Sequence, residues 1–111
     1  MDDDDEIRDL VCDILSKDGF AVISAGDVDG ALAAFDRHAG PLALAIIDLT
    51  LRGRSGAHLA AELERRRPGL RTLIVSGELV DESPEGRPFL PKPFTPRALR
   101  SKVKELLGDV R

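Results

Sequence analysis

The chain has 111 residues, of which 42% are hydrophobic, 32% charged and 4% aromatic. This size fits one domain, residues 1–111, and no apolar run approaches the roughly 20 residues of a membrane span, so we expect a cytoplasmic protein without a membrane segment. The net charge of −4 argues against direct binding to nucleic acid, which needs a basic face. The single Cys12 can form no internal disulfide, which fits a reducing compartment.

The first third of the chain predicts a helix, a short strand and a second helix. Apolar residues recur at helical spacing from Glu6, and Gly19 stands where a glycine ends such a helix. Residues 21–25 (AVISA) are short and β-branched, which predicts a strand. Asp27 is placed to cap a helix that runs to about Arg37, before Gly40 and Pro41.

Two continuous apolar runs follow, and each predicts a strand buried on both faces. The first is 42–48 (LALAIID) and the second is 70–77 (LRTLIVSG). Between them Ser55 is placed to cap a third helix, which Pro68 and Gly69 close.

The last part of the chain predicts one more strand and one more helix. Residues 78–88 are polar and broken by proline and glycine, with room for one helical turn at most. Residues 89–91 (FLP) predict a brief strand, and Thr95 with Pro96 opens the final helix. Strands that alternate with helices indicate an α/β domain with a parallel sheet covered on both faces.

Acidic and polar residues stand at the carboxyl ends of these strands, where ligands gather in parallel sheets. Asp48 and Ser76 end the two buried strands, Lys92 follows the last strand, and Asp2 and Asp3 lie where a strand before the first helix would end. Clustered carboxylates repel, so they need a cation or raised pKa values. A hard divalent cation such as Mg²⁺ takes such oxygen ligands.

This set of residues suits phosphoryl transfer. One carboxylate could act as the nucleophile while the metal neutralises the phosphoryl oxygens, with Lys92 adding a fixed positive charge and Ser76 a hydroxyl donor. Plainer interpretations remain open. The acidic run could be a solvated helix N-terminus, Asp48 and Ser76 could belong to turns, and Lys92 could be an ordinary surface lysine.

Four segments in order, DDDDEIRDL, IIDLTLRGRSG, VSG and LPKPF, resemble the phosphoacceptor receiver domain of two-component response regulators. The short stretch between Ser76 and Phe89 resembles the compact receivers attached to hybrid histidine kinases. One departure lies in the acceptor loop, where Arg52 replaces the common proline.

The resemblance implies a flavodoxin-like, doubly wound parallel sheet with strand order 2-1-3-4-5 and a fourth helix that is short or absent. The family's first, central strand would precede Asp2, so we expect it to be missing or truncated here. It could lie upstream of Met1, be supplied by another chain, or be bypassed by direct pairing of residues 21–25 with residues 42–48. We expect the chain as written to be less stable than a full receiver and to bind metal weakly, because unpaired backbone groups in a core are costly.

The resemblance also assigns the site. Asp48 would be the phosphoacceptor, and Mg²⁺ (or Mn²⁺) would be held directly by Asp3 and Asp48, through water by Asp2, and by the backbone carbonyl of Thr50. Ser76 and Lys92, whose bond to the next proline is often cis in the family, would complete the catalytic set. Ser76 and Phe89 would also be the switch residues, while Thr50 and Glu78 would tune hydrolysis of the acyl phosphate.

The implied function is a signalling switch without turnover chemistry beyond its own phosphorylation and dephosphorylation. A histidine kinase or phosphotransfer protein would donate the phosphoryl group, and the readout would be a downstream partner protein or a phosphate sink, with a homodimer left open. The competing hypothesis is a pseudo-receiver, an interaction module with the fold but no phosphorylation. A dehalogenase-type phosphatase is disfavoured because it needs a second aspartate where Thr50 stands.

The remaining reactive residues predict no site. His38 and His58 have no partner at metal-ligand spacing, and we assign them no role in phosphoryl relay. Cys12 is expected to be a small packing residue on the first helix. The basic run at 65–67 is expected to complement the dipole at a helix C-terminus.

Overall fold

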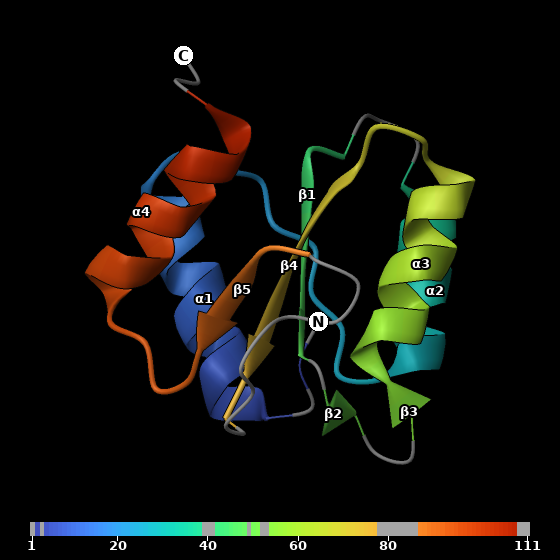
Figure 1. Ribbon diagram of the computed structural model, residues 1–111, viewed down its shortest axis with the longest axis horizontal. Helices are drawn as coiled ribbons and strands as arrows, with labels where there is room; N and C mark the ends of the chain where they lie inside the picture. Colours follow the sequence, from blue (N-terminus) through green and yellow to red (C-terminus); the bar gives the residue numbers. More distant parts are fainter. Residues whose placement is uncertain are drawn as a thin grey trace.

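The computed structural model describes Asp2 and residues 4–38, 42–48, 50–51, 54–77 and 87–108, with only the backbone described at 50, 51, 54 and 55. Figure 1 shows a central sheet between two helical layers, with α1 and α4 on one face and α2 and α3 on the other. The elements are α1 (Asp5–Lys17), α2 (Val28–Arg37), β1 (Leu44–Asp48), β2 (Thr50–Leu51), β3 (Arg54–Ser55), α3 (Gly56–Arg66), β4 (Arg71–Ser76), β5 (Phe89–Pro91) and α4 (Pro96–Leu107).

The sheet is parallel, as predicted. Its described strands lie in the order β1-β4-β5, which corresponds to strands 3-4-5 of the expected order. Asp48 is paired with Val75, and Ser76 with Pro91, so the carboxyl ends of all three strands reach the same edge. A short antiparallel pair, β2 with β3, lies just beyond β1 and was not predicted.

The predicted strand at 21–25 is wrong. These residues have no strand assignment, and they form no ladder with β1, whose described neighbour is β4. A strand exists through its hydrogen-bonded neighbours, and the described backbone bond to this segment is a single one, from the Asp2 N–H to the Ala25 carbonyl at 3.3 Å. Direct pairing of residues 21–25 with residues 42–48 therefore does not replace the expected first strand, and no strand precedes α1 among the described residues.

A cavity of about 400 Å³ lies between β1 and residues 20–25. Helix α1 covers it from one face of the sheet and α2 from the other, and its lining is mainly apolar. Among the β1 residues that line the cavity, Leu44, Ala45 and Ile46 are only half-buried, while Ile47 is fully buried. The two helical layers therefore enclose a space beside β1, in the place where the expected first strand would lie.

Capping residues set the helix ends largely as predicted. Asp4 accepts hydrogen bonds from two backbone N–H groups in the first turn of α1, and Asp27 and Thr95 cap α2 and α4 in the same way. Gly19 follows α1 with a φ of +93°, a conformation that favours glycine. Ser55 directly precedes α3, with its backbone paired in β3.

Helix α2 ends where the sequence predicted, and α3 ends two residues before Pro68. Helix α2 ends at Arg37, with His38 as its C-cap, while Gly40 and Pro41 lie outside the described residues. Helix α3 ends at Arg66, before Pro68. None of the helices in the described ranges is both long enough and apolar enough to cross a lipid bilayer.

The core consists of two apolar clusters, one on each face of the sheet. One contains Phe35 of α2, Leu59 and Leu63 of α3, and Ile47 and Ile74 of the sheet. The other joins α1 and α4 to the opposite face through the buried residues Ile14, Leu15, Leu73, Val75, Leu90, Leu99 and Val103. Both helical layers therefore hold the sheet whose edge carries the polar residues.

The basic run at the end of α3 makes specific side-chain contacts. Arg66 pairs with Asp36 on α2 at 2.9 Å, while Arg67 lies 4.8 Å over the ring of Phe35 and donates a hydrogen bond to the carbonyl of His38. These contacts join α2 to α3. They add to the expected effect of a cation at a helix C-terminus.

Candidate functional site

The candidate site lies at the carboxyl edge of the sheet. Asp48 ends β1 and Ser76 ends β4, and their exposed fractions are 6% and 1%. The Lys92 N–H donates to the Ser76 carbonyl at 2.7 Å, which extends the pairing of β4 with β5 by one residue. Strand register therefore brings these three residues to one edge, as the sequence predicted.

The Lys92 ammonium lies between two carboxylates. Its Nζ is 2.8 Å from Oδ2 of Asp2 and 3.4 Å from Oδ2 of Asp48. Asp2 is itself buried, with 5% of its surface exposed. The N-terminal acidic run is thus more than a solvated helix end, because Asp2 points into the same site as Asp48.

The two carboxylates stabilise the positive charge of Lys92. Burial of the Lys92 ammonium acts to lower its pKa, but the hydrogen bond to Asp2 and the negative charges of Asp2 and Asp48 outweigh that effect, so the pKa of Lys92 is raised above its ordinary value. Lys92 therefore stays protonated and neutralises part of the carboxylate charge.

The geometry fits a hard cation. Oδ2 of Asp2 is buried and, beside the ammonium of Lys92, accepts no hydrogen bond in the described part of the chain. Buried carboxylate oxygens of this kind are the ligands that Mg²⁺ takes. The described residues alone contain no group of three acidic, histidine or cysteine side chains arranged for a metal, and Asp3, a predicted ligand, lies outside them.

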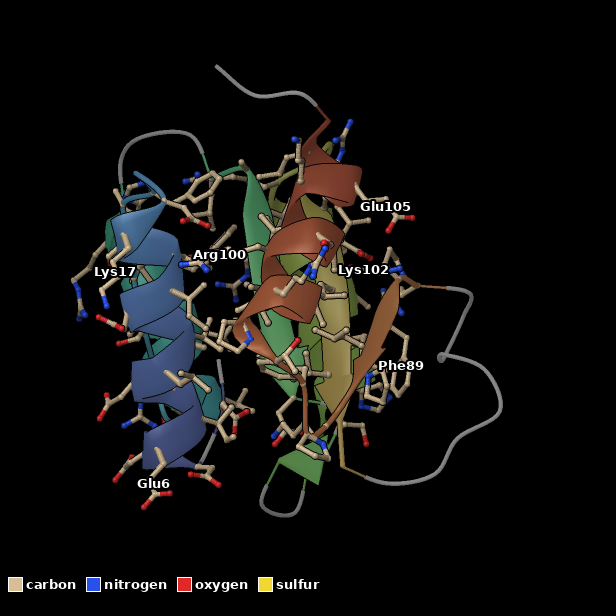
Figure 2. The ribbon with its side chains drawn as sticks, turned by 90° about the vertical axis from the view of Figure 1, so that its left-hand side faces the viewer. Glu6, Lys17, Phe89, Arg100, Lys102 and Glu105 are labelled. Carbon is tan, nitrogen blue, oxygen red and sulfur yellow. The ribbon has the colours of Figure 1, made fainter. Side chains whose placement is uncertain are left out.

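The other predicted site residues are described to different degrees. Thr50 lies in β2, two residues after Asp48, with only its backbone described, and Glu78 lies outside the described residues. Phe89 begins β5, half-buried beside the cluster that includes Ile74, and Figure 2 shows it at the outer side of the sheet. The bond between Lys92 and Pro93 is cis.

His58, His38 and Cys12, which were given no role in the site, belong to the helical layers. His58 is exposed on α3, and His38 caps α2. Cys12 is half-buried on α1 and lines the cavity beside β1, which agrees with a packing role.

Arg8 makes a contact with Asp2 that the sequence did not predict. Its Nη1 donates to the main-chain carbonyl of Asp2 at 2.9 Å. An arginine in the first turns of a helix is common, and nothing in the sequence pattern indicates that it folds back onto a carbonyl six residues earlier. Only the path of the chain before α1 brings the two groups together.

Comparison with known proteins agrees with this architecture. The family model of the response regulator receiver domain matches residues 1–104. The chain belongs to this family. The family resemblance predicted from the four sequence motifs is thereby confirmed.

Individual relatives and solved structures are similar to nearly the whole chain. The chain is 32% identical over 120 residues to the transcriptional regulatory protein AruR of Pseudomonas aeruginosa, which covers 100% of this chain and 49% of AruR. The chain therefore spans about half the length of that relative. The receiver domain of the hybrid histidine kinase CckA superposes with a TM-score of 0.82 at 28% identity, over 96% of this chain and 94% of that one.

A third similar protein was solved with a bound metal ion. The response regulator TrrA of Thermotoga maritima, whose structure was solved in complex with Mg²⁺ and BeF, is 26% identical to this receiver. It superposes with a TM-score of 0.81 over 96% of this chain and 94% of that one.

Proposed function

We propose that this receiver domain accepts a phosphoryl group on Asp48 in a Mg²⁺-dependent reaction and thereby switches its interaction with a partner protein. The observation that carries the proposal is the buried Asp48 at the end of β1, with the Lys92 ammonium 3.4 Å from its Oδ2. A carboxylate in this position combines a nucleophile with a fixed positive charge for the incoming phosphoryl oxygens.

The donor is a phosphohistidine on a histidine kinase or phosphotransfer protein, or a small phosphodonor. An oxygen of Asp48 forms a bond to phosphorus as the phosphorus–nitrogen bond of the donor breaks, and the electron pair of that bond returns to the histidine. Lys92 balances the charge on the transferred group. The domain is a phosphoacceptor rather than an enzyme acting on other substrates.

The metal ligands in this proposal are Asp2, Asp3, Asp48 and the backbone carbonyl of Thr50. When bound, Mg²⁺ neutralises the phosphoryl oxygens that would otherwise repel the acceptor carboxylate. The Mg²⁺ in the TrrA complex supports this part of the proposal by analogy.

Phosphorylation adds about −1.5 to −2 charges at Asp48. This charge draws Lys92 and the Ser76 hydroxyl towards the phosphoryl group, and Phe89 turns inward as the switch residue. The change shifts an equilibrium between two conformations at the far side of β5. Thr50 and Glu78 set how fast the acyl phosphate hydrolyses.

We place this switch in the cytoplasm, with a partner protein or a second copy of the chain as its output. The relatives of this chain include a transcriptional regulatory protein and a sensor kinase. This supports a histidine kinase as the upstream partner. Direct contact with nucleic acid is not part of the proposal, because the net charge is −4.

Intact-mass measurement after incubation with acetyl phosphate and Mg²⁺ tests the proposal. We expect an increase of about 80 Da, one phosphoryl group, that disappears in Asp48→Ala and when Mg²⁺ is removed by chelation. Asp9→Ala, which removes an exposed carboxylate of α1, is the matched control and should be phosphorylated like the wild type.

The alternative is a pseudo-receiver that binds partners without phosphorylation. The cavity beside β1 favours this alternative, since no strand among the described residues lies next to Asp2 to hold it. The absence of any mass increase with acetyl phosphate, phosphoramidate or a phosphorylated histidine kinase would support the pseudo-receiver and reject the switch.

A further inference from the structure

Asp2 is held at three separate points, although no described strand precedes it. Its backbone N–H donates to the Ala25 carbonyl at 3.3 Å. Its carbonyl accepts from Nη1 of Arg8 at 2.9 Å, and its Oδ1 accepts from the Asp4 N–H at 2.9 Å. With these groups satisfied, its Oδ2 is the oxygen that meets Lys92, 2.8 Å away.

The Arg8 guanidinium is itself held from two sides. Its Nη2 pairs with the carboxylate of Asp5, which lies one helical turn earlier. The side chain is 22% exposed, and its end rests against Gly26. A Cβ added at Gly26 would lie 2.7 Å from Nη1 and 3.4 Å from Cζ. The glycine therefore leaves the space that the guanidinium occupies.

We propose that Arg8, seated against Gly26, is a positioning residue that aims the Asp2 carboxylate at the cation site. The proposal rests on the cation site of the proposed function. In that site, Arg8 and Gly26 would hold Asp2 in position. Arg8 touches neither Asp48 nor Lys92 in the contacts described, so it acts through Asp2. Removing a group that orients a metal ligand typically weakens metal binding by about 10–100-fold.

Three variants test the proposal through Mn²⁺ binding, measured as free Mn²⁺ by electron paramagnetic resonance. Arg8→Met should weaken Mn²⁺ binding by about 10-fold or more. Gly26→Ala should weaken it as well, because the new methyl group displaces the end of the Arg8 side chain at little other cost. The double variant should bind no more weakly than Arg8→Met alone, since the effect of Gly26→Ala requires the guanidinium.

Arg100→Met is the matched control. Arg100 lies on α4 and faces α1 (Figure 2), where its Nε pairs with Asp18 at 2.9 Å, at the far end of α1 from Asp2. Its loss removes an arginine–carboxylate pair without touching the acidic site, so Mn²⁺ affinity should stay within about twofold of wild type. Equal weakening by Arg100→Met and Arg8→Met would mean that general destabilisation causes the effect, and it would overturn the proposal.

A metal-free measurement separates this proposal from the proposed function. The Asp4 amide, which donates to Asp2 Oδ1, should exchange its hydrogen faster in Arg8→Met and in Gly26→Ala than in Arg100→Met. Unchanged exchange of this amide, or unchanged Mn²⁺ affinity in Arg8→Met, would overturn the positioning role. Failure of the wild-type protein to bind Mn²⁺ would instead overturn the cation site, while the amide exchange would still decide whether Arg8 orients Asp2.

Discussion

The two sides of β1 are built in different ways. On one side β4 pairs with it along its full length, and the five residues Thr72–Ser76 of β4 are all buried. On the other side lies the cavity bordered by residues 20–25, and Leu44, Ala45 and Ile46 are only half-buried. The polar site spans both sides, with Asp48, Ser76 and Lys92 held by the paired strands and Asp2 held by single contacts.

This difference separates two ways of placing a functional side chain. A residue at the end of a paired strand inherits its position from a ladder of backbone hydrogen bonds and from the core beneath it. Asp2 depends on one backbone bond, one arginine and one turn. Because fewer contacts fix it, the position of Asp2 should be easier to disturb than that of Asp48.

The largest effect is expected from adding a strand on the side of β1 that faces the cavity. Joining about five or six apolar, β-branched residues before Met1, a typical strand length, should fill the cavity and pair with β1. Backbone bonds of about 1 kcal/mol each should together raise the free energy of unfolding by several kcal/mol, or the melting temperature by about 15 °C or more. Mg²⁺ binding should tighten, because Asp2 would then follow a paired strand.

A matched extension of the same length made of glycine and serine is the control, since it adds chain without an apolar strand. Thermal unfolding by circular dichroism and Mg²⁺ titration would measure both effects. Equal melting temperatures for the two extended proteins would show that the cavity does not accept a strand.

Next in size is the effect of Lys92→Met on the paired side. The change leaves Asp2 and Asp48, whose side chains are 7% and 9% exposed, without their shared ammonium, at a cost of about 3 kcal/mol. Added Mg²⁺ should restore more of the lost stability than it adds to the wild type, since it supplies the missing positive charge. Lys102→Met, which removes an exposed pair with Glu105, should change little.

Lys92 also predicts a pH dependence. Its pKa is raised in the folded protein above the ordinary lysine value of 10.5, so its stabilising contribution is complete below that value and is lost as the pH rises through the folded pKa. Wild type and Lys102→Met should therefore lose stability above about pH 10.5 more steeply than Lys92→Met. Parallel pH profiles of unfolding for all three proteins would contradict the ion-pair arrangement.

The smallest expected difference is between the same substitution in β4 and in β1, on the face of the sheet that α1 and α4 cover. Leu73→Ala creates a cavity at a fully buried position of β4 and should cost about 3 kcal/mol, whereas Leu44→Ala enlarges a space that already exists and should cost about 1 kcal/mol. Chemical denaturation measures both. Similar losses for the two variants would show that the side of β1 facing the cavity is as tightly packed as the other side.

Local patterns in the sequence determined most of the elements and one edge of the site. Capping by Asp27 and Thr95 and the glycine after α1 follow from short-range chemistry, so they could be predicted without the fold. The apolar runs that end in Asp48 and Ser76 predicted buried parallel strands, and parallel strands bring their carboxyl ends together. The grouping of Asp48 with Lys92 follows from that rule.

Tertiary structure decided the remainder. Residues 21–25 have the composition of a strand, but strand formation depends on a neighbour that local composition cannot supply. The ammonium shared by Asp2 and Asp48, and the arginine that folds back from α1 onto the Asp2 carbonyl, join groups whose separation in the sequence carries no periodic pattern. Such contacts arise only when packed helices and strands fix the path of the chain, because the energies that select them come from burial and charge in three dimensions.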